Sequence, residues 1–535
     1  MSSGSPSRPS QPAGYGTSLS RNTAVMAAGT LLSRLTGFAR LVALAYALGF
    51  SRLTDTYNLA NVTPNIVYEL VLGGVLSATL VPVFVDRLSR DDDEEAWRAI
   101  SAVVTAATAV LVVLTVAFFL LAPVLIRLYT LGNDTGSAGD QRAVATTLLR
   151  MFAPQVAFYG MVTVTTAVLH ARRRFAAPMF TPVLNNLVVI GVLLALPHVA
   201  DRLSLRAMRG QAGALALLGL GTTSGVVAMA LALLPALRHA RVRLRPVWAP
   251  GHEAVRAELR LSGWTFGFVA ANQVTLWIVL VLANGRRGDV SAYQAGQIFF
   301  LLPHGVFAVS VMSALLPDLS EDWARRDVDG YRRGIGVGLR TIATVMVPAA
   351  VGYICLARPI VTVALEHGAL EPSSAATTAT VLALLAVGLP GFSAYLFLTR
   401  AYQAMQDTRA MFFLYLVENT INVVVALALY PVMKVGGLAL AYAVAYTGGT
   451  AVALAHLGRR IGGVEAVAVV RSWLRVLVAS AAMASAVVAV AVLVEPDLLE
   501  VVTAVVTGAA VYVLAARALG VEEVSALLRF GRRVA

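Results

Sequence analysis

The chain is too apolar and too sparsely charged to be a soluble protein. Of its 535 residues, 58% are hydrophobic and 13% are charged, about half the charged fraction of a soluble domain. The net charge of +13 does not require a nucleic-acid partner, because membrane proteins concentrate arginine in their cytoplasmic loops. The single cysteine, Cys355, excludes an internal disulfide and a cysteine-ligated metal site. The composition predicts an all-α polytopic membrane protein.

Fourteen apolar segments, separated by short polar breaks, predict fourteen transmembrane helices, since a span needs roughly 20 residues. Residues 1–21 are rich in Ser, Pro and Gly and predict a disordered cytoplasmic tail. Residues 518–535 predict a second cytoplasmic segment. Pro64, Pro303 and Pro390 interrupt three of the segments. The predicted spans are 22–48, 55–88, 97–128, 142–170, 175–198, 210–237, 254–284, 289–318, 331–365, 373–402, 408–432, 436–457, 468–493 and 498–517.

The distribution of basic residues predicts the orientation of the chain. With the amino terminus inside, the inside loops hold nearly three times as many basic residues as the outside loops. This bias places both termini in the cytoplasm. The predicted outside loops hold Arg52, Arg127, Arg142, Arg202, Arg206, Arg209, Arg286, Arg287, Arg358 and Lys434.

An internal repeat divides the spans into two sets. The segment LLAPVLIRLYTLG at 120–132 is similar to CLARPIVTVALEHG at 355–368, and other matches keep the same offset of about 235 residues. The offset predicts two six-helix lobes, 22–237 and 254–457, in the same orientation, with a substrate between them. Spans thirteen and fourteen, 468–517, are an addition to this core.

The first span carries two arginines, Arg34 and Arg40, with Gly37 between them. An arginine at mid-bilayer costs on the order of 3 kcal/mol, so these side chains either face a wet cavity or snorkel to the lipid headgroups. Six residues separate them by about 120° on an ideal helix. They could still converge on one anion if Gly37 lets the helix bend. Paired guanidinium groups suit a diphosphate.

Acidic and amide side chains follow in the second span. Asp55 opens it, Asn65 follows Pro64, and Glu69 lies one turn further on. A carboxylate at this depth needs a partner, a proton or a cation. Glu69 could pair with one of the first-span arginines in the empty protein, or it could couple transport to membrane potential or to an ion.

Several motifs resemble the MviN/MurJ family of lipid II flippases. They are SRLTGFAR (33–40), Asp55, PN (64–65), ELVLGGVLSATLVPVF (69–84) and LPHGVFAVSVMSALLPDLS (302–320). The resemblance extends over nearly all fourteen spans, and the ELVLGGVL form is similar to actinobacterial members. It implies the fold of the multidrug/oligosaccharidyl-lipid/polysaccharide exporters, with two six-helix lobes, and two further C-terminal helices that in this family form a groove for the polyprenyl tail.

The resemblance also implies which residues bind substrate, although the match is incomplete. Tyr68 stands where many members have an arginine, and Ile298 and Leu301 stand where many have an arginine and an acid. These departures predict a less basic cavity, with neutral amides in the second lobe. The predicted substrate-binding residues are Arg34, Arg40, Asp55, Asn65, Tyr68, Glu69, Gln294 and Gln297.

The function that these features predict is transport of lipid-linked peptidoglycan precursor, lipid II, from the inner to the outer leaflet by alternating access. No nucleophile–base pair, metal motif or nucleotide loop points to an enzyme or a bound cofactor. Lipid II, membrane lipids and cell-wall synthases are the expected partners. The alternatives are an exporter of another polyprenyl-linked glycan or of a soluble drug, and a transport-inactive scaffold of the cell-wall machinery.

Overall fold

The computed structural model describes residues 15–69, 84, 93–131, 136–172, 174–240, 242–249, 263–494 and 497–524. All regular secondary structure in these ranges is helical, which confirms the predicted fold class. Helix α1 begins at Tyr15, before the predicted start of the first span at 22. The remainder of the predicted amino-terminal tail, 1–14, lies outside the described residues.

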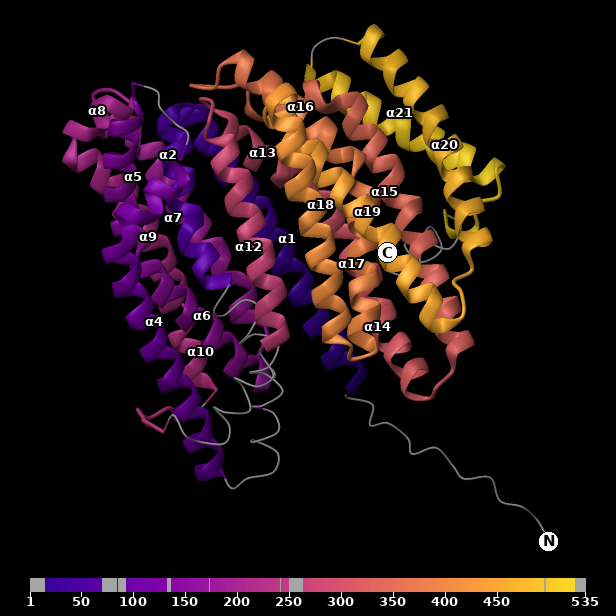
Figure 1. Ribbon diagram of the computed structural model, residues 1–535, viewed down its shortest axis with the longest axis horizontal. Coiled ribbons are helices and arrows are strands. Elements are labelled where there is room, and N and C mark those ends of the chain that lie inside the picture. The colour runs from indigo at the N-terminus through magenta and orange to yellow at the C-terminus, as the bar shows by residue number, and fades with distance from the viewer. Residues whose placement is uncertain are drawn as a thin grey trace.

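The helices fall into two lobes and a carboxy-terminal pair (Figure 1). We call the part of the chain up to residue 240 the N-lobe and residues 263–461 the C-lobe. The N-lobe holds α1 (Tyr15–Leu48), α2 (Arg52–Tyr68), α4 (Asp93–Tyr129), α5 (Ala138–Phe152), α6 (Pro154–Ala171), α7 (Ala176–Val199), α8 (Leu205–Gly210), α9 (Ala212–Leu231) and α10 (Leu234–His239).

The C-lobe and the final pair complete the bundle, and Figure 1 shows the pair at its edge. The C-lobe holds α12 (Gly263–Ala283), α13 (Asp289–Pro303), the π-helix η2 (His304–Ala308), α14 (Val309–Ala324), α15 (Val328–Leu365), α16 (Pro372–Val387), α17 (Leu389–Ala404), α18 (Thr408–Met433) and α19 (Val435–Ile461). The pair is α20 (Ala466–Leu493) and α21 (Asp497–Ala518).

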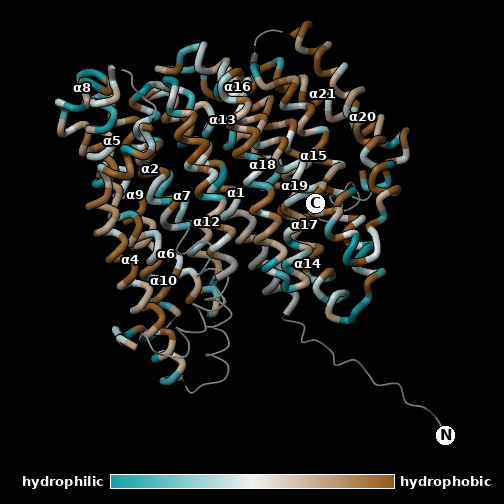
Figure 2. Tube along the Cα trace, viewed as in Figure 1, coloured by the Kyte–Doolittle hydropathy of each residue, from teal (hydrophilic) through white to brown (hydrophobic). Residues whose placement is uncertain are grey.

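Most of the helices can span a membrane. In the described residues, 12 helices are long and apolar enough, or 13 if the bent pair α16–α17 forms one span. The predicted count of fourteen is not reached there. Helix α2 has only 17 residues, and the rest of the predicted second span lies largely outside the described part. Apolar side chains of α4 and α21, such as Leu120 and Val506, are more than half exposed, as lipid-facing residues are. Figure 2 shows that both helices are mostly hydrophobic along their length.

Two of the three predicted interruptions distort the helices. Pro303 ends α13, and the chain continues through the single π-helical turn of η2. Pro390 lies at the start of α17, just after the 50° bend that separates α17 from α16. Pro64, by contrast, lies inside a continuous α2.

Close approach of small residues packs the C-lobe. Gly338 of α15 faces Phe397 of α17 so closely that an added Cβ would overlap the ring. Van der Waals packing of this kind drives helix association where lipid removes the hydrophobic contribution.

Replacing Gly338 by alanine tests this packing. We expect Gly338→Ala to cost about 1–3 kcal/mol, because an overpacked core must shift, and to lower the midpoint of thermal unfolding in detergent. Gly352→Ala is the matched control on the same helix, since a Cβ there meets nothing within 4 Å. Equal midpoints for the two variants would contradict the contact between α15 and α17.

Candidate functional site

Helix α1 lies between the two lobes (Figure 1). It packs against α7 of the N-lobe along its length. Its outer half also contributes Leu41 and Ala45 to a buried cluster with α13, α15 and α16 of the C-lobe. The rings of Phe38 and Phe299 meet edge to face at 5.2 Å across the same contact. Side chains on α1 can therefore reach either lobe.

Arg34 is exposed and extends toward the C-lobe. A Cβ built on Gly305 would lie 3.7 Å from the Nε atom of Arg34, so the guanidinium lies over the π-helical turn η2. The distortion that follows Pro303 thus lies beside one of the two predicted diphosphate ligands.

Arg40 is half-buried and faces the N-lobe. Its Nη2 atom donates to the Tyr57 hydroxyl at 3.4 Å, and that hydroxyl lies 3.2 Å from the Thr222 hydroxyl of α9. The two arginines therefore face different lobes, as their 120° separation predicts.

Gly37 does not bend α1, which is continuous from Tyr15 to Leu48. Instead, the side-chain amide of Asn186 on α7 lies beside it and donates to the carbonyl oxygen of Ser33 at 3.3 Å and to the hydroxyl of Thr36 at 3.1 Å. These contacts fix α1 to the N-lobe between the two arginines.

Asp55 lies at the predicted outer end of α2, where the N-lobe meets the C-lobe. Its carboxylate is fully buried. It accepts hydrogen bonds from the Gly288 amide at 2.6 Å, the Ser291 amide at 3.1 Å and the Ser291 hydroxyl at 2.8 Å. The structure therefore brings Asp55 to a contact between the lobes, where its carboxylate bonds to Gly288 and Ser291, and its role in binding substrate stays a prediction.

Further hydrogen bonds surround this contact. Arg52 Nη1 donates to the carbonyl oxygen of Asn284 at 2.7 Å, and the Gln141 amide donates to Asn284 Oδ1 at 2.8 Å. Asn58 donates to the Ser291 hydroxyl at 3.1 Å. We call Arg52, Asp55 and Asn58 together with Asn284, Gly288 and Ser291 the outer latch.

Gly288 supports the latch through its backbone. Its φ of +85° is a conformation that L side chains rarely adopt. A Cβ there would also lie 2.8 Å from the carbonyl oxygen of Phe50. Only glycine can present its amide to Asp55 at this position. Sequence reasoning missed the latch partners, and the one available signal was the loop NGRRGD (284–289), whose glycines allow a tight turn.

The other predicted residues do not gather around the arginines. Asn65 donates within its own helix to Asn61 at 3.3 Å, and the side chain of Tyr68 lies outside the description. Glu69 is exposed, and within the described part of the chain no ion pair joins it to either arginine. Its coupling role stays a prediction. Gln297 donates to Tyr293 at 3.2 Å, and Gln294 is half-buried on the same helix.

The C-lobe also buries Glu418 among tyrosines. Its side chain is 1% exposed, and Oε2 has no hydrogen-bond partner in the described structure. The neighbouring Asn419 of α18 donates to Asn272 of α12 at 3.0 Å, which joins the two helices.

An apolar groove of about 580 Å³ lies between the C-lobe and the final helix pair. Its walls come from η2, α15, α20 and α21 and include Phe307, Pro348, Met483, Ala504 and Ala509. Phe307 is in η2, so the groove begins beside the turn that Arg34 covers.

Polar contacts fasten the final pair to α15. Tyr512 of α21 donates to the carbonyl oxygen of Thr344 at 2.6 Å. Arg340 pairs with Glu523 at 2.9 Å and with Glu465 at 3.3 Å. Arg340 is therefore an ion-pair residue at the inner end of α15.

Comparison with known families identifies one match. The family model described as "Lipid II flippase MurJ" matches residues 44–507. Relatives named "Probable lipid II flippase MurJ" include one from Rhizobium tropici, 27% identical over 80% of this chain and 79% of the relative. Another, from Thermotoga maritima, is 25% identical over 80% of this chain and 83% of the relative.

Solved structures share the fold. One described as "Lipid II flippase MurJ, inward closed conformation" aligns with a TM-score of 0.76 and 20% identity, over 92% of this chain and 97% of the other. An inward-facing multidrug resistance transporter of the MATE family aligns with a TM-score of 0.67 and 13% identity, over 82% of this chain and 98% of the other.

Removing the charge of Asp55 should loosen the outer latch. In Asp55→Asn, the amide replaces an oxygen that accepts from backbone N–H groups, and each hydrogen bond to a charged group contributes about 1.5–3 kcal/mol. A cysteine replacing Leu59, a buried residue one turn further along α2, reports opening in a Cys355→Ser background. We expect Asp55→Asn to raise its labelling by an impermeant maleimide from outside by about tenfold or more.

The matched control for this experiment is Asp140→Asn. Asp140 is also at the outer end, but it pairs with Arg209 at 3.0 Å within the N-lobe. Its replacement should leave labelling at position 59 unchanged. Identical labelling in Asp55→Asn and the parent would show that the carboxylate does not hold the lobes together.

Proposed function

Because the chain belongs to the lipid II flippase MurJ family, whose model matches residues 44–507, we propose that it carries lipid II across the bacterial plasma membrane by alternating access. It is a membrane transporter of this family. The observation that supports the mechanism best is the placement of Arg34 and Arg40 on a helix between the lobes, one facing each lobe.

The diphosphate of lipid II would bind between these two arginines. Guanidinium groups donate in a fork that matches phosphate oxygens. A diphosphate that contacts Arg34 over η2 and Arg40 beside Tyr57 would touch both lobes at once. Gln294 and Gln297 then offer neutral amides to the sugars and peptide, which carry many hydrogen-bonding groups.

The outer latch determines which side the headgroup enters from. Its hydrogen bonds all lie at the predicted outer end, so we assign this structure to the state that is closed outside. With both termini in the cytoplasm, lipid II would load from the inner leaflet, and the latch would have to break before release.

The apolar groove beside α20 and α21 would hold the polyprenyl tail. Its walls are almost entirely hydrocarbon, and it begins at η2, next to Arg34. A lipid could therefore place its diphosphate at Arg34 and its first isoprene units in the groove without crossing polar surface.

For the energy source we propose the membrane potential or a coupled ion. Each charge that crosses the membrane responds by about 2.3 kcal/mol per 100 mV. Glu69 is exposed in this structure, so it would be accessible to a proton or a cation while the protein is closed outside.

Replacing either arginine should weaken headgroup binding. We expect Arg34→Ala and Arg40→Ala to raise the Kd for lipid II by about 10- to 100-fold, since each loses a charged hydrogen bond. Both should fail to complement a depleted strain at normal membrane levels. The variants Arg34→Lys and Arg40→Lys should recover part of the activity. Lysine keeps the positive charge but cannot donate two parallel hydrogen bonds to a phosphate as arginine does.

Arg150→Ala is the control for these variants. Arg150 lies in a predicted span, and its guanidinium stacks over Phe119 within the N-lobe, 5.5 Å from the ring centroid. Its removal should leave binding unchanged. Full complementation by Arg40→Ala would remove Arg40 from the proposed site.

Filling the groove should separate tail binding from headgroup binding. Ala509→Trp places a large ring in the groove, whereas Ala510→Trp places it on the neighbouring exposed position outside the lining. We expect Ala509→Trp to slow transport of lipid II in reconstituted vesicles and to leave the affinity for a tail-free headgroup analogue unchanged. Equal transport by the two tryptophan variants would contradict a tail in the groove.

A further inference from the structure

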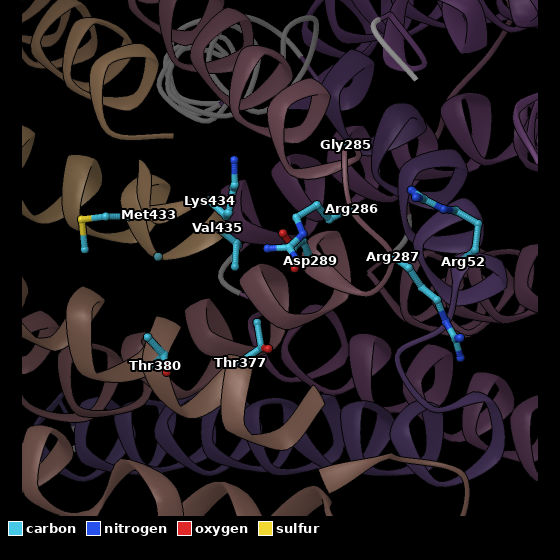
Figure 3. A pocket seen from close by; sticks show the side chains of 11 residues that line it. Arg52, Gly285, Arg286, Arg287, Asp289, Thr377, Thr380, Met433, Lys434 and Val435 are labelled. Carbon is cyan, nitrogen blue, oxygen red and sulfur yellow. The ribbon is translucent and has the colours of Figure 1, made fainter. Parts of the chain in front are cut away.

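A basic pocket of about 560 Å³ opens at the outer end, beside the latch. Four cationic side chains line it, and Figure 3 shows Arg286 next to Asp289, with Arg52 and Arg287 together to one side. We call Arg52, Arg286, Arg287 and Lys434 the outer basic pocket. Its walls come from α2, the α12–α13 loop, α16 and the junction of α18 and α19.

The outer basic pocket concentrates basic residues on the side of the membrane where the chain has few of them. Basic residues are depleted from the predicted outside loops, yet four of the ten found there meet in this one place. Three carboxylates lie close by. Glu371 pairs with Arg287 at 3.2 Å, and Asp289, which is 7% exposed, lines the pocket. The buried carboxylate of Asp55 in the latch interacts electrostatically with Arg52. One positive charge remains in excess, and nearby like charges repel each other.

The cations keep donors for a ligand. The contacts of Arg52 with Asn284 engage only Nη1 of its guanidinium. Lys434 uses one of its three ammonium protons in a bond of 2.8 Å to the Pro431 carbonyl oxygen. Arg286 is exposed at the pocket mouth. The hydroxyls of Thr377 and Thr380 donate within α16, so the pocket selects its ligand by positive charge.

We propose that the outer basic pocket binds a phosphate group on the outer side of the membrane and thereby holds the outer latch closed. The group comes either from a lipid headgroup in the outer leaflet or from free phosphate in solution. This inference goes beyond the proposed function, since the site is separate from Arg34 and Arg40 and does not depend on what they bind.

The outer basic pocket is coupled to the outer latch because its cations come from both lobes. Arg52 belongs to α2 of the N-lobe, whereas the other three cations belong to the C-lobe. Arg52 is itself a latch residue, and Gly288 of the latch lies between Arg287 and Asp289. Separation of α2 from α13 would remove one cation from the pocket. The closed state therefore binds the anion more tightly, and by linkage the anion favours the closed state.

The first experiment tests the proposal with a soluble anion. It measures how fast a cysteine at position 59 is labelled from outside. In spheroplasts, added inorganic diphosphate reaches only the outer face of a latch-closed protein. We expect it to slow labelling severalfold in the Leu59→Cys, Cys355→Ser parent, whereas sodium chloride at equal ionic strength does not. In the double variant Lys434→Gln, Arg286→Gln this slowing is lost.

A second experiment tests whether the bound phosphate group belongs to a lipid headgroup. In reconstituted vesicles, phosphatidylglycerol in place of phosphatidylcholine should slow labelling without added diphosphate, again only when Lys434 and Arg286 are present. Slowing by diphosphate alone identifies free phosphate as the source, and slowing by phosphatidylglycerol identifies the headgroup.

Two further double variants act as controls. Arg202→Gln, Arg206→Gln removes the same charge from the outer face of the N-lobe and should keep the response. Lys434→Arg, Arg286→Lys keeps the pocket charge and should also respond, which separates loss of binding from loss of fold. The proposal is overturned if neither diphosphate nor phosphatidylglycerol slows labelling, or if the glutamine pair at 434 and 286 responds as the parent does.

Discussion

The closed outer end of this transporter depends on one buried carboxylate. Asp55 has no exposed surface, and a charge in that position is tolerated only when its oxygens are fully hydrogen-bonded. Its donors all come from the opposite lobe, two of them from the backbone at the start of α13. When the lobes separate, the carboxylate loses these donors together, so water must replace them. The contact therefore has two discrete states, hydrogen-bonded or hydrated, and partly separated arrangements are unstable.

The arginines of α1 place a second constraint on the same motion. Arg40 is held by Tyr57 on α2, and α1 is fixed to α7 by Asn186. Arg34 instead lies over the π-helical turn of the C-lobe. A helix fixed to one lobe thus presents a cation to the other. Movement between the lobes changes the distance between Arg34 and η2 without unfolding any helix, as the proposed binding and release of a diphosphate requires.

Local sequence features predicted the fold and the family, and they failed where a residue's partner is distant in the chain. Hydropathy and prolines indicated the helical fold and the distortion after Pro303, and helix periodicity separated Arg34 from Arg40. Asp55 was predicted to bind substrate from the family resemblance, and a buried carboxylate also needs a partner. That partner is a turn more than two hundred residues away, which no local pattern identifies. A pair between Glu69 and Arg34 or Arg40 was also plausible from sequence, yet the described residues show no such ion pair.

The attachment of the last two helices has a mechanical consequence. Arg340 and Tyr512 join α20 and α21 to α15, so the groove is built onto the C-lobe and would travel with it. During rocking, a lipid tail in the groove would remain stationary relative to that lobe, while the diphosphate near α1 would be displaced from it. The polyprenyl tail of the lipid would then be anchored at a fixed point on the C-lobe. The reach of the headgroup through the protein would be set by the few isoprene units between η2 and the diphosphate, and not by the full length of the tail.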